Sequence, residues 1–136
     1  MSPQAPVKND HLLNQWTELE AAHARVREAL ERMLQRTHQL SLSEYEVLRR
    51  LAGADAPKGR RIQELAEEVH LSQSALSRLV GRLEEVGYVT RATCDYDRRG
   101  IFACITDAGR KAQEEAHPTY VAVLAETLGE GRSATA

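Results

Sequence analysis

Two short helical patterns separated by a tight turn constrain the fold of this chain most. Apolar residues recur at spacings of three and four over residues 62–69, which predicts a two-turn helix. After a turn at residues 70–71, Ser72 is a suitable N-cap for a second helix, and Gly87 is suited to end it. The sequence therefore predicts two helices that meet at a sharp turn.

Strand-forming segments follow the second helix directly. Residues 88–91 and 101–105 flank a polar stretch, which predicts a hairpin, and residues 60–61 are a further candidate strand. Strict alternation would turn the side chains of Ile101, Ala103 and Ile105 inward and those of Phe102 and Cys104 outward. Two helices and a hairpin predict a mainly α fold with a small β-hairpin wing, a winged helix-turn-helix.

The second helix has one face suited to contact DNA. Its apolar face carries Leu76, Leu79, Val80 and Leu83. The other face offers amide, hydroxyl and guanidinium groups that can address base edges and phosphates in a major groove, from Gln73, Ser74, Ser77, Arg78 and Arg82. No acidic residue occurs from residue 72 to residue 83, which favours DNA contact over a merely solvated face.

The polar stretch of the hairpin carries Arg98 and Arg99. An arginine on a thin hairpin can enter a minor groove, where negative potential is concentrated. Asp97 is adjacent, and an aspartate can hold an arginine fork in position through charge-assisted hydrogen bonds. A charged turn that merely keeps the hairpin solvated is the alternative.

A long amphipathic helix is predicted over residues 10–40. Its stripe steps by alternating intervals of four and three along Leu12, Trp16, Leu19, His23, Val26, Leu30 and Met33. A helix of about 30 residues is roughly 45 Å long. A lobe of this size cannot cover it, so the stripe indicates a partner, most simply a second copy. A helix of an intrachain bundle is the alternative.

Five segments are expected. They are a flexible N-terminus (1–9), a dimerisation helix (10–40), a DNA-binding lobe (41–106), a second dimerisation helix (107–128) and a disordered tail (129–136). Within the lobe, Ser43 and Glu46 match a capping box. Within the last helix, Pro118 is expected to kink or split the helix near His117.

Composition excludes several classes of function. The N-terminus lacks the apolar core of a signal peptide, and no apolar run approaches a membrane span, so a cytoplasmic, nucleoid-associated protein without a membrane partner is expected. Cys94 and Cys104 are too few for a disulfide scaffold, and the five histidines show no convincing metal spacing. No catalytic motif and no cofactor fingerprint occurs, so an enzyme is not expected.

The motifs of residues 41–111 together resemble the MarR family of bacterial transcriptional regulators. The resemblance lies in IQELAEEVHLSQSALSRLVGRLEEVGYVTR and DRRGIFACITDAG. It implies a homodimer on double-stranded DNA with a pseudo-palindromic operator, a recognition helix at residues 72–87, and Arg99 in the minor groove, oriented by Asp97. It also implies an effector crevice, for which Trp16, His38 and Tyr45 are candidates. The chain departs from the family at Pro118 and in its short C-terminal region.

The sequence thus predicts a DNA-binding repressor that a small-molecule effector releases. Two alternatives remain open: a winged-helix module that binds proteins, and a redox-responsive regulator that uses Cys94 and Cys104. The cysteines lie near the base of the wing, with no basic environment evident in the sequence, which favours inert thiols.

Overall fold

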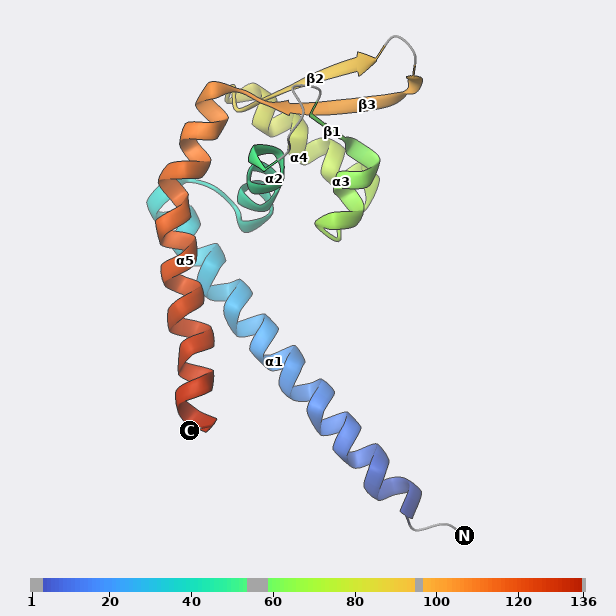
Figure 1. Ribbon diagram of the computed structural model, residues 1–136, viewed down its shortest axis with the longest axis vertical. Helices are drawn as coiled ribbons and strands as arrows, with labels where there is room; N and C mark the ends of the chain where they lie inside the picture. The colour runs from blue at the N-terminus through green and yellow to red at the C-terminus, as the bar shows by residue number, and fades with distance from the viewer. Residues whose placement is uncertain (1–3, 54–58, 95–96, 136) are drawn as a thin grey trace.

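Long helices from the two ends of the chain carry a small lobe between them in the computed structural model (Figure 1). The structure describes residues 4–53, 59–94 and 97–135, and the side chains of residues 9–53, 59–92 and 100–129 among them. The elements are α1 (Gln4–His38), α2 (Leu42–Ala52), β1 (Arg60–Arg61), α3 (Ile62–Glu68), α4 (Gln73–Glu85), β2 (Val89–Cys94), β3 (Asp97–Ile105) and α5 (Asp107–Thr135).

The lobe is a winged helix-turn-helix, as the sequence predicts. Its antiparallel sheet has the order β1-β3-β2, and the candidate strand at residues 60–61 pairs with β3. Helices α2, α3 and α4 lie beside this sheet (Figure 1). The core of the lobe is aliphatic apart from one tyrosine, and it comprises Leu42, Tyr45, Val47, Leu48, Leu51, Ile62, Leu65, Ala66, Leu76, Leu79, Val80, Leu83, Val89 and Ala103.

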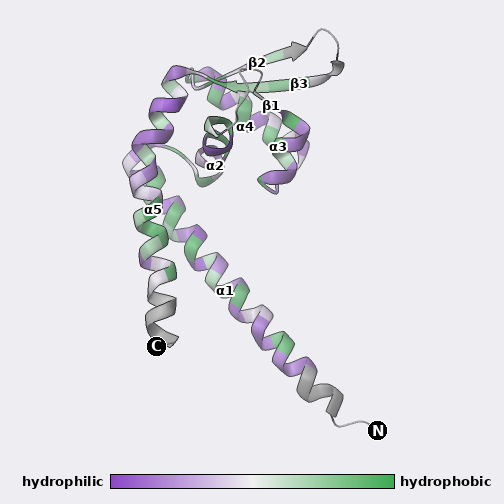
Figure 2. Cartoon of the chain, viewed as in Figure 1, coloured by the Kyte–Doolittle hydropathy of each residue, from purple (hydrophilic) through white to green (hydrophobic). Residues whose placement is uncertain are grey.

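The apolar stripe of α1 has two different environments. Its C-terminal half packs against α5, where Leu30 of the stripe and the neighbouring Leu34 are buried. Its N-terminal half extends away from the lobe, and Figure 2 shows apolar residues recurring along it. There Leu12, Trp16 and Leu19 are each about 60% exposed. The intrachain alternative is therefore correct for one half of the stripe, while the other half is uncovered in the single chain.

Both terminal helices are longer than the sequence predicts. Helix α1 begins at Gln4, so the expectation of a flexible segment over residues 1–9 is wrong for residues 4–9. Pro6 lies in the first turn of α1, where a missing N–H costs nothing. Helix α5 reaches Thr135, so it neither splits at Pro118 nor ends at residue 128 before a disordered tail. Ala116 and Val123, on either side of Pro118, are buried and hold both parts of α5 in place.

The capping box of α2 lies two residues before the predicted one. Ser41 is the N-cap: its Oγ accepts a hydrogen bond from the Glu44 N–H at 3.0 Å, and the Glu44 carboxylate accepts one from the Ser41 N–H at 2.7 Å. The assignment to Ser43 and Glu46 is therefore wrong. Glu46 instead accepts hydrogen bonds from Arg49 and Arg50 of its own helix.

Alternation along β3 holds only near the core. Ala103 is fully buried, as predicted, and Ile105 is partly buried. Ile101 lies on the same face of the strand but is 46% exposed, so the prediction that it points into the core is wrong. The strand has run past the edge of the core at that point, and Ile101 lines an open groove instead.

Candidate nucleic-acid interface

Helix α4 is fixed at both ends by local hydrogen bonds. Ser72 Oγ accepts a hydrogen bond from the Ala75 N–H at 3.1 Å and so caps the N-terminus. At the C-terminus Gly87 adopts a φ of 84°, and the N–H groups of Gly87 and Tyr88 donate to the carbonyls of Glu84 and Leu83. This pattern is a Schellman motif, which glycine adopts without strain. Both ends of the predicted recognition helix are therefore confirmed.

The turn before α4 has a similar backbone pattern. His70 has a φ of 59°, and the Leu71 N–H donates to the Ala66 carbonyl at 3.0 Å. The backbone of α3 thus ends in a left-handed residue two positions before the α4 cap. This sharp turn sets the angle between α3 and α4 and turns one face of α4 away from the core.

The two faces of α4 are those that the sequence predicts. The four apolar residues on the inner face are buried, whereas Gln73, Ser74, Arg78 and Arg82 are exposed and Ser77 is partly exposed. Arg82 Nε lies 3.9 Å from Glu44 Oε2, and the Arg82 side chain is 59% exposed. At this long separation, with Arg82 mostly exposed and the Glu44 side chain 18% exposed, the pair contributes little, so the Arg82 guanidinium can turn toward a phosphate.

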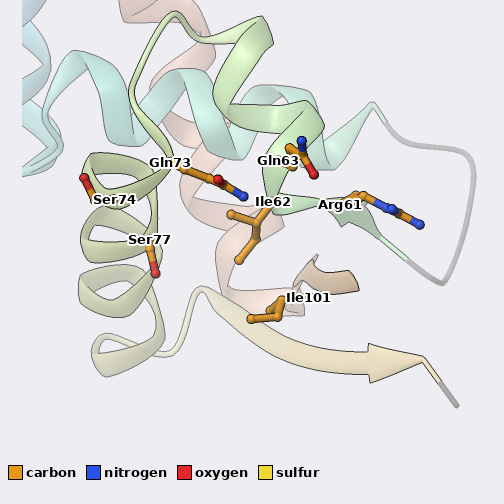
Figure 3. A pocket seen from close by; sticks show the side chains of 7 residues that line it. All are labelled: Arg61, Ile62, Gln63, Gln73, Ser74, Ser77 and Ile101. Carbon is orange, nitrogen blue, oxygen red and sulfur yellow. The ribbon is translucent and has the colours of Figure 1, made fainter. Parts of the chain in front are cut away.

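A groove of about 390 Å³ separates the start of α4 from α3 and the wing. Figure 3 shows Gln73 of α4 and Ile62 of α3 extending into it, with Ile101 of β3 beneath them. Its lining residues are Arg61, Ile62, Gln63, Gln73, Ser74, Ser77 and Ile101. The guanidinium of Arg61 lies 5.6 Å from the centroid of the Phe102 ring, a cation–π distance. Sequence reasoning missed Arg61 and Gln63, because their position depends on how β1 pairs with β3.

Arg91 of β2 is a further polar contact of α4 that sequence reasoning missed. Its guanidinium donates to the carbonyl oxygen of Ser77 and, at 3.3 Å, to Ser77 Oγ. Its Nε lies 3.0 Å from Glu84 Oε1. The predicted contact residue Ser77 is therefore hydrogen-bonded to the wing strand.

The wing arginines are placed by their backbone alone. Asp97, Arg98 and Arg99 begin β3, where Asp97 pairs with Cys94 beyond an irregularity after Thr93. The side chains of residues 97–99 lie outside the described residues. That Asp97 orients Arg99 for a minor groove therefore stays a prediction.

Two of the three candidate effector residues lie against α5. His38 Nε2 is 2.8 Å from Thr119 Oγ1, and the fully buried Tyr45 has its hydroxyl 3.3 Å from Gln113 Nε2. Trp16 is separate, because it lies on the extended half of α1 beside Leu19, Glu20 and His23. The structure thus brings His38 and Tyr45 to the junction of α1, α2 and α5 and leaves Trp16 out.

A charged cluster lies at the same junction. Burial alone would raise the pKa of Glu46, but hydrogen bonds from Arg49 and Tyr120 and the charges of Arg49 and Arg50 outweigh it and lower that pKa. Burial, reinforced by the hydrogen bond to Glu46, raises the pKa of Tyr120 to about 12. Tyr120 of α5 is therefore a neutral donor that links the terminal helix to the lobe.

The remaining predictions concern cysteines, metal ligands and membrane spans. The side chain of Cys104 is partly buried, whereas the side chain of Cys94 lies outside the described residues. Within the described ranges, His, Cys, Asp and Glu form no group of three that could hold a metal ion. None of the described helices is long and apolar enough to cross a membrane.

Comparison with known proteins agrees with the geometry of the lobe. The family model described as MarR family matches residues 38–100. The DNA complex of Sco3205, a MarR family transcriptional regulator from Streptomyces coelicolor, aligns with a TM-score of 0.79 and 30% identity, over 87% of this chain and 73% of that chain.

Two further proteins are similar over most of the chain. YwaE of Bacillus subtilis (strain 168), an uncharacterized HTH-type transcriptional regulator, is 29% identical over 119 residues, 86% of this chain and 68% of YwaE. The Mycobacterium tuberculosis MarR family protein RV2887, solved in complex with salicylic acid, aligns with a TM-score of 0.66 and 26% identity, over 82% of this chain and 80% of that chain. The chain therefore belongs to the MarR family, whose members are DNA-binding transcriptional regulators and not enzymes.

Proposed function

We propose that this chain is a repressor that binds a pseudo-palindromic operator as a homodimer. The observation that carries the proposal is the outer face of α4, which is exposed, bears two arginines and has no acidic residue over its first three turns. In the proposed complex Gln73, Ser74 and Arg78 contact base edges and phosphates in a major groove. Arg98 and Arg99 extend from the wing into the adjacent minor groove.

The uncovered apolar surface of the terminal helices supports the homodimer. Leu12, Leu13, Trp16 and Leu19 of α1 are each 58–60% exposed, and Leu128 of α5 is 53% exposed. An exposed stripe of large apolar side chains at heptad spacing favours association with a second helix. A second copy presents the same stripe, which a two-fold symmetric interface requires.

A small-molecule effector is proposed to act at the junction of α1, α2 and α5. The complex of RV2887 with salicylic acid supports an effector of this size. His38 and Tyr45 contact α5 at this junction, so a ligand there would change how the lobe sits on the terminal helices. A dimer requires half-sites about 34–36 Å apart, so a small reorientation of the two lobes would release DNA.

Selection of bound fragments from genomic DNA tests the proposal directly. Wild-type protein is expected to enrich an inverted repeat with half-sites about one helical turn apart, and to bind it less tightly as salt rises. A reporter gene behind the enriched site should be expressed more strongly when the regulator is deleted. Enrichment of no sequence, or binding that is insensitive to salt, would refute DNA reading by α4.

A further inference from the structure

One arginine joins the wing to the recognition helix. Arg91 lies on β2 two residues after Val89, which is 2% exposed, so the two side chains share the face of the strand that turns toward α4. Its guanidinium donates to the carbonyl and the hydroxyl of Ser77 and pairs with Glu84. A single side chain therefore holds two points of α4 that are two turns apart.

The face of α4 beneath Arg91 is shaped for this contact. Ser77, Gly81 and Glu84 follow one another at spacings of four and three, so they lie along one face of the helix. A Cβ atom at Gly81 would lie 3.8 Å from Arg91 Nη2. The guanidinium thus passes over the one position of this face that has no side chain, between an acceptor group at each end.

The position of Arg91 on the hairpin allows the contact to influence the direction of the wing. Arg91 is paired with Ala103, and Arg99 lies four residues earlier on the same strand β3. At about 3.3 Å per residue, the backbone of Arg99 is roughly 13 Å beyond the contact. A change of wing angle at Arg91 therefore moves Arg99 relative to α4.

We propose that Arg91 is a positioning residue that fixes the direction of the wing relative to the recognition helix. The proposal rests on the proposed function, because it concerns how α4 and Arg99 reach the same DNA. A guanidinium suits the role, since its planar fork of donors can bond Ser77 and Glu84 together, whereas a lysine ammonium is a compact point charge.

The contact with Arg91 also affects whether Ser77 donates or accepts a hydrogen bond. A hydroxyl has one proton and two lone pairs. Because Arg91 donates to Ser77 Oγ, one lone pair is used and the proton remains to be donated. Ser77 held in this way presents a donor to the groove, which favours acceptors such as phosphate oxygens or the O6 and N7 atoms of guanine.

A double-mutant cycle on the enriched operator tests the proposal. Arg91→Ala is expected to weaken operator binding roughly tenfold, the cost of losing one or two hydrogen bonds that hold the wing. Arg99→Ala should weaken binding in the wild type but have little further effect in the Arg91→Ala background, because the misdirected wing no longer delivers Arg99. Arg78→Ala, on the outer face of α4, is the matched control and should weaken binding by the same factor in both backgrounds.

The other possible results distinguish a positioning role of Arg91 from other roles. Full additivity of Arg91→Ala with Arg99→Ala would overturn the proposal in favour of an independent contact. If Arg91→Lys kept the operator affinity of the wild type, the proposal would also be overturned. A lysine supplies the positive charge that a direct contact with a DNA phosphate needs, but not the planar fork that a positioning role needs. If Arg91→Ala fails to fold by circular dichroism, the cycle is run with Arg91→Lys and Glu84→Gln. A wild-type protein that selects no operator refutes the proposed function first and this proposal with it.

Discussion

The ring of Tyr120 on α5 lies 4.6 Å from the ring of Tyr45 on α2, centroid to centroid, at an interplanar angle of 32°. Tyr45 is fully buried, and the guanidinium of Arg49 lies 5.7 Å from the centroid of the Tyr120 ring. The pair connects the long C-terminal helix to the helix that begins the lobe. This packed aromatic contact therefore joins α5 to α2.

Removing the Tyr45 ring should be far more costly than removing its hydroxyl. Tyr45→Ala leaves a cavity in the core and is expected to lower the free energy of unfolding by about 3–5 kcal/mol. Tyr45→Phe loses only the weak contacts to Gln113 and His117, at 3.3 and 3.4 Å, and is expected to cost about 1 kcal/mol. Urea unfolding measures both. Equal losses would contradict a role based on ring packing.

The free energy of unfolding should fall at both extremes of pH. The pKa of Glu46 is lowered in the folded chain, so its contribution is present above the ordinary value of 4.5 and is lost as the pH falls below it. The pKa of Tyr120 is raised from 10.0 to about 12, so its contribution is present below pH 10 and is lost between pH 10 and about 12. Thermal unfolding across this range should show a weaker acid dependence in Glu46→Gln and a weaker alkaline dependence in Tyr120→Phe.

Two helical glycines should respond to alanine in opposite ways. At Gly81 an added Cβ makes ordinary contact with Arg91, so Gly81→Ala is expected to stabilise the chain by about 0.5–1 kcal/mol through helix propensity. At Gly109 the Cβ would lie 2.2 Å from the Tyr88 carbonyl oxygen, so Gly109→Ala must displace α5 from the end of the hairpin and destabilise the chain. Melting temperatures of the two variants, measured side by side, check the signs.

Arg78→Ala should weaken operator binding by about 1–3 kcal/mol if the side chain contacts a base edge. Such a contact also relaxes the sequence preference at one operator position. Arg27→Ala, an exposed arginine on α1, is the matched control and should leave affinity unchanged. Fluorescence anisotropy at two salt concentrations measures both effects. Loss of affinity without any change in preference would assign Arg78 to a phosphate instead.

A charge on the uncovered stripe should disrupt the proposed homodimer. Leu19→Glu places a carboxylate in the middle of the apolar stripe and is expected to shift the population toward monomer. Ala21→Glu adds the same charge to the same turn of α1, on an exposed position off the stripe. Sedimentation equilibrium distinguishes the two. Dimers of equal stability in both variants would place the interface elsewhere.

Helix α4 and the turn before it could be predicted because their signals are local. Ser72 and Gly87 act through hydrogen bonds to backbone groups within a few residues, so residue type and spacing suffice. The short strand at residues 60–61 could also be predicted, but its pairing with β3 could not, because that pairing joins segments far apart in the sequence. The unusual turn residue His70 gave no such signal, since left-handed conformations outside glycine are uncommon.

The features that sequence reasoning predicted wrongly or missed depend on contacts between elements that are distant in the sequence. Two overlapping Ser-x-x-Glu windows match a capping box, and the choice is made by Glu31 of α1, whose carboxylate oxygens lie 3.3 Å from the Leu42 N–H. The helix through Pro118 persists because neighbouring residues of α5 are buried against the rest of the chain. The contacts of Arg91 depend on the angle at which β2 returns across α4, which no spacing in the sequence encodes.

The exposed half of α1 also carries the only tryptophan of the chain, Trp16, with 59% of its surface exposed. An indole in water emits at longer wavelength than one enclosed by side chains. The unmodified protein therefore contains an optical probe on the surface where a partner helix is expected. A blue shift of its emission with increasing protein concentration would report burial of this surface without any label.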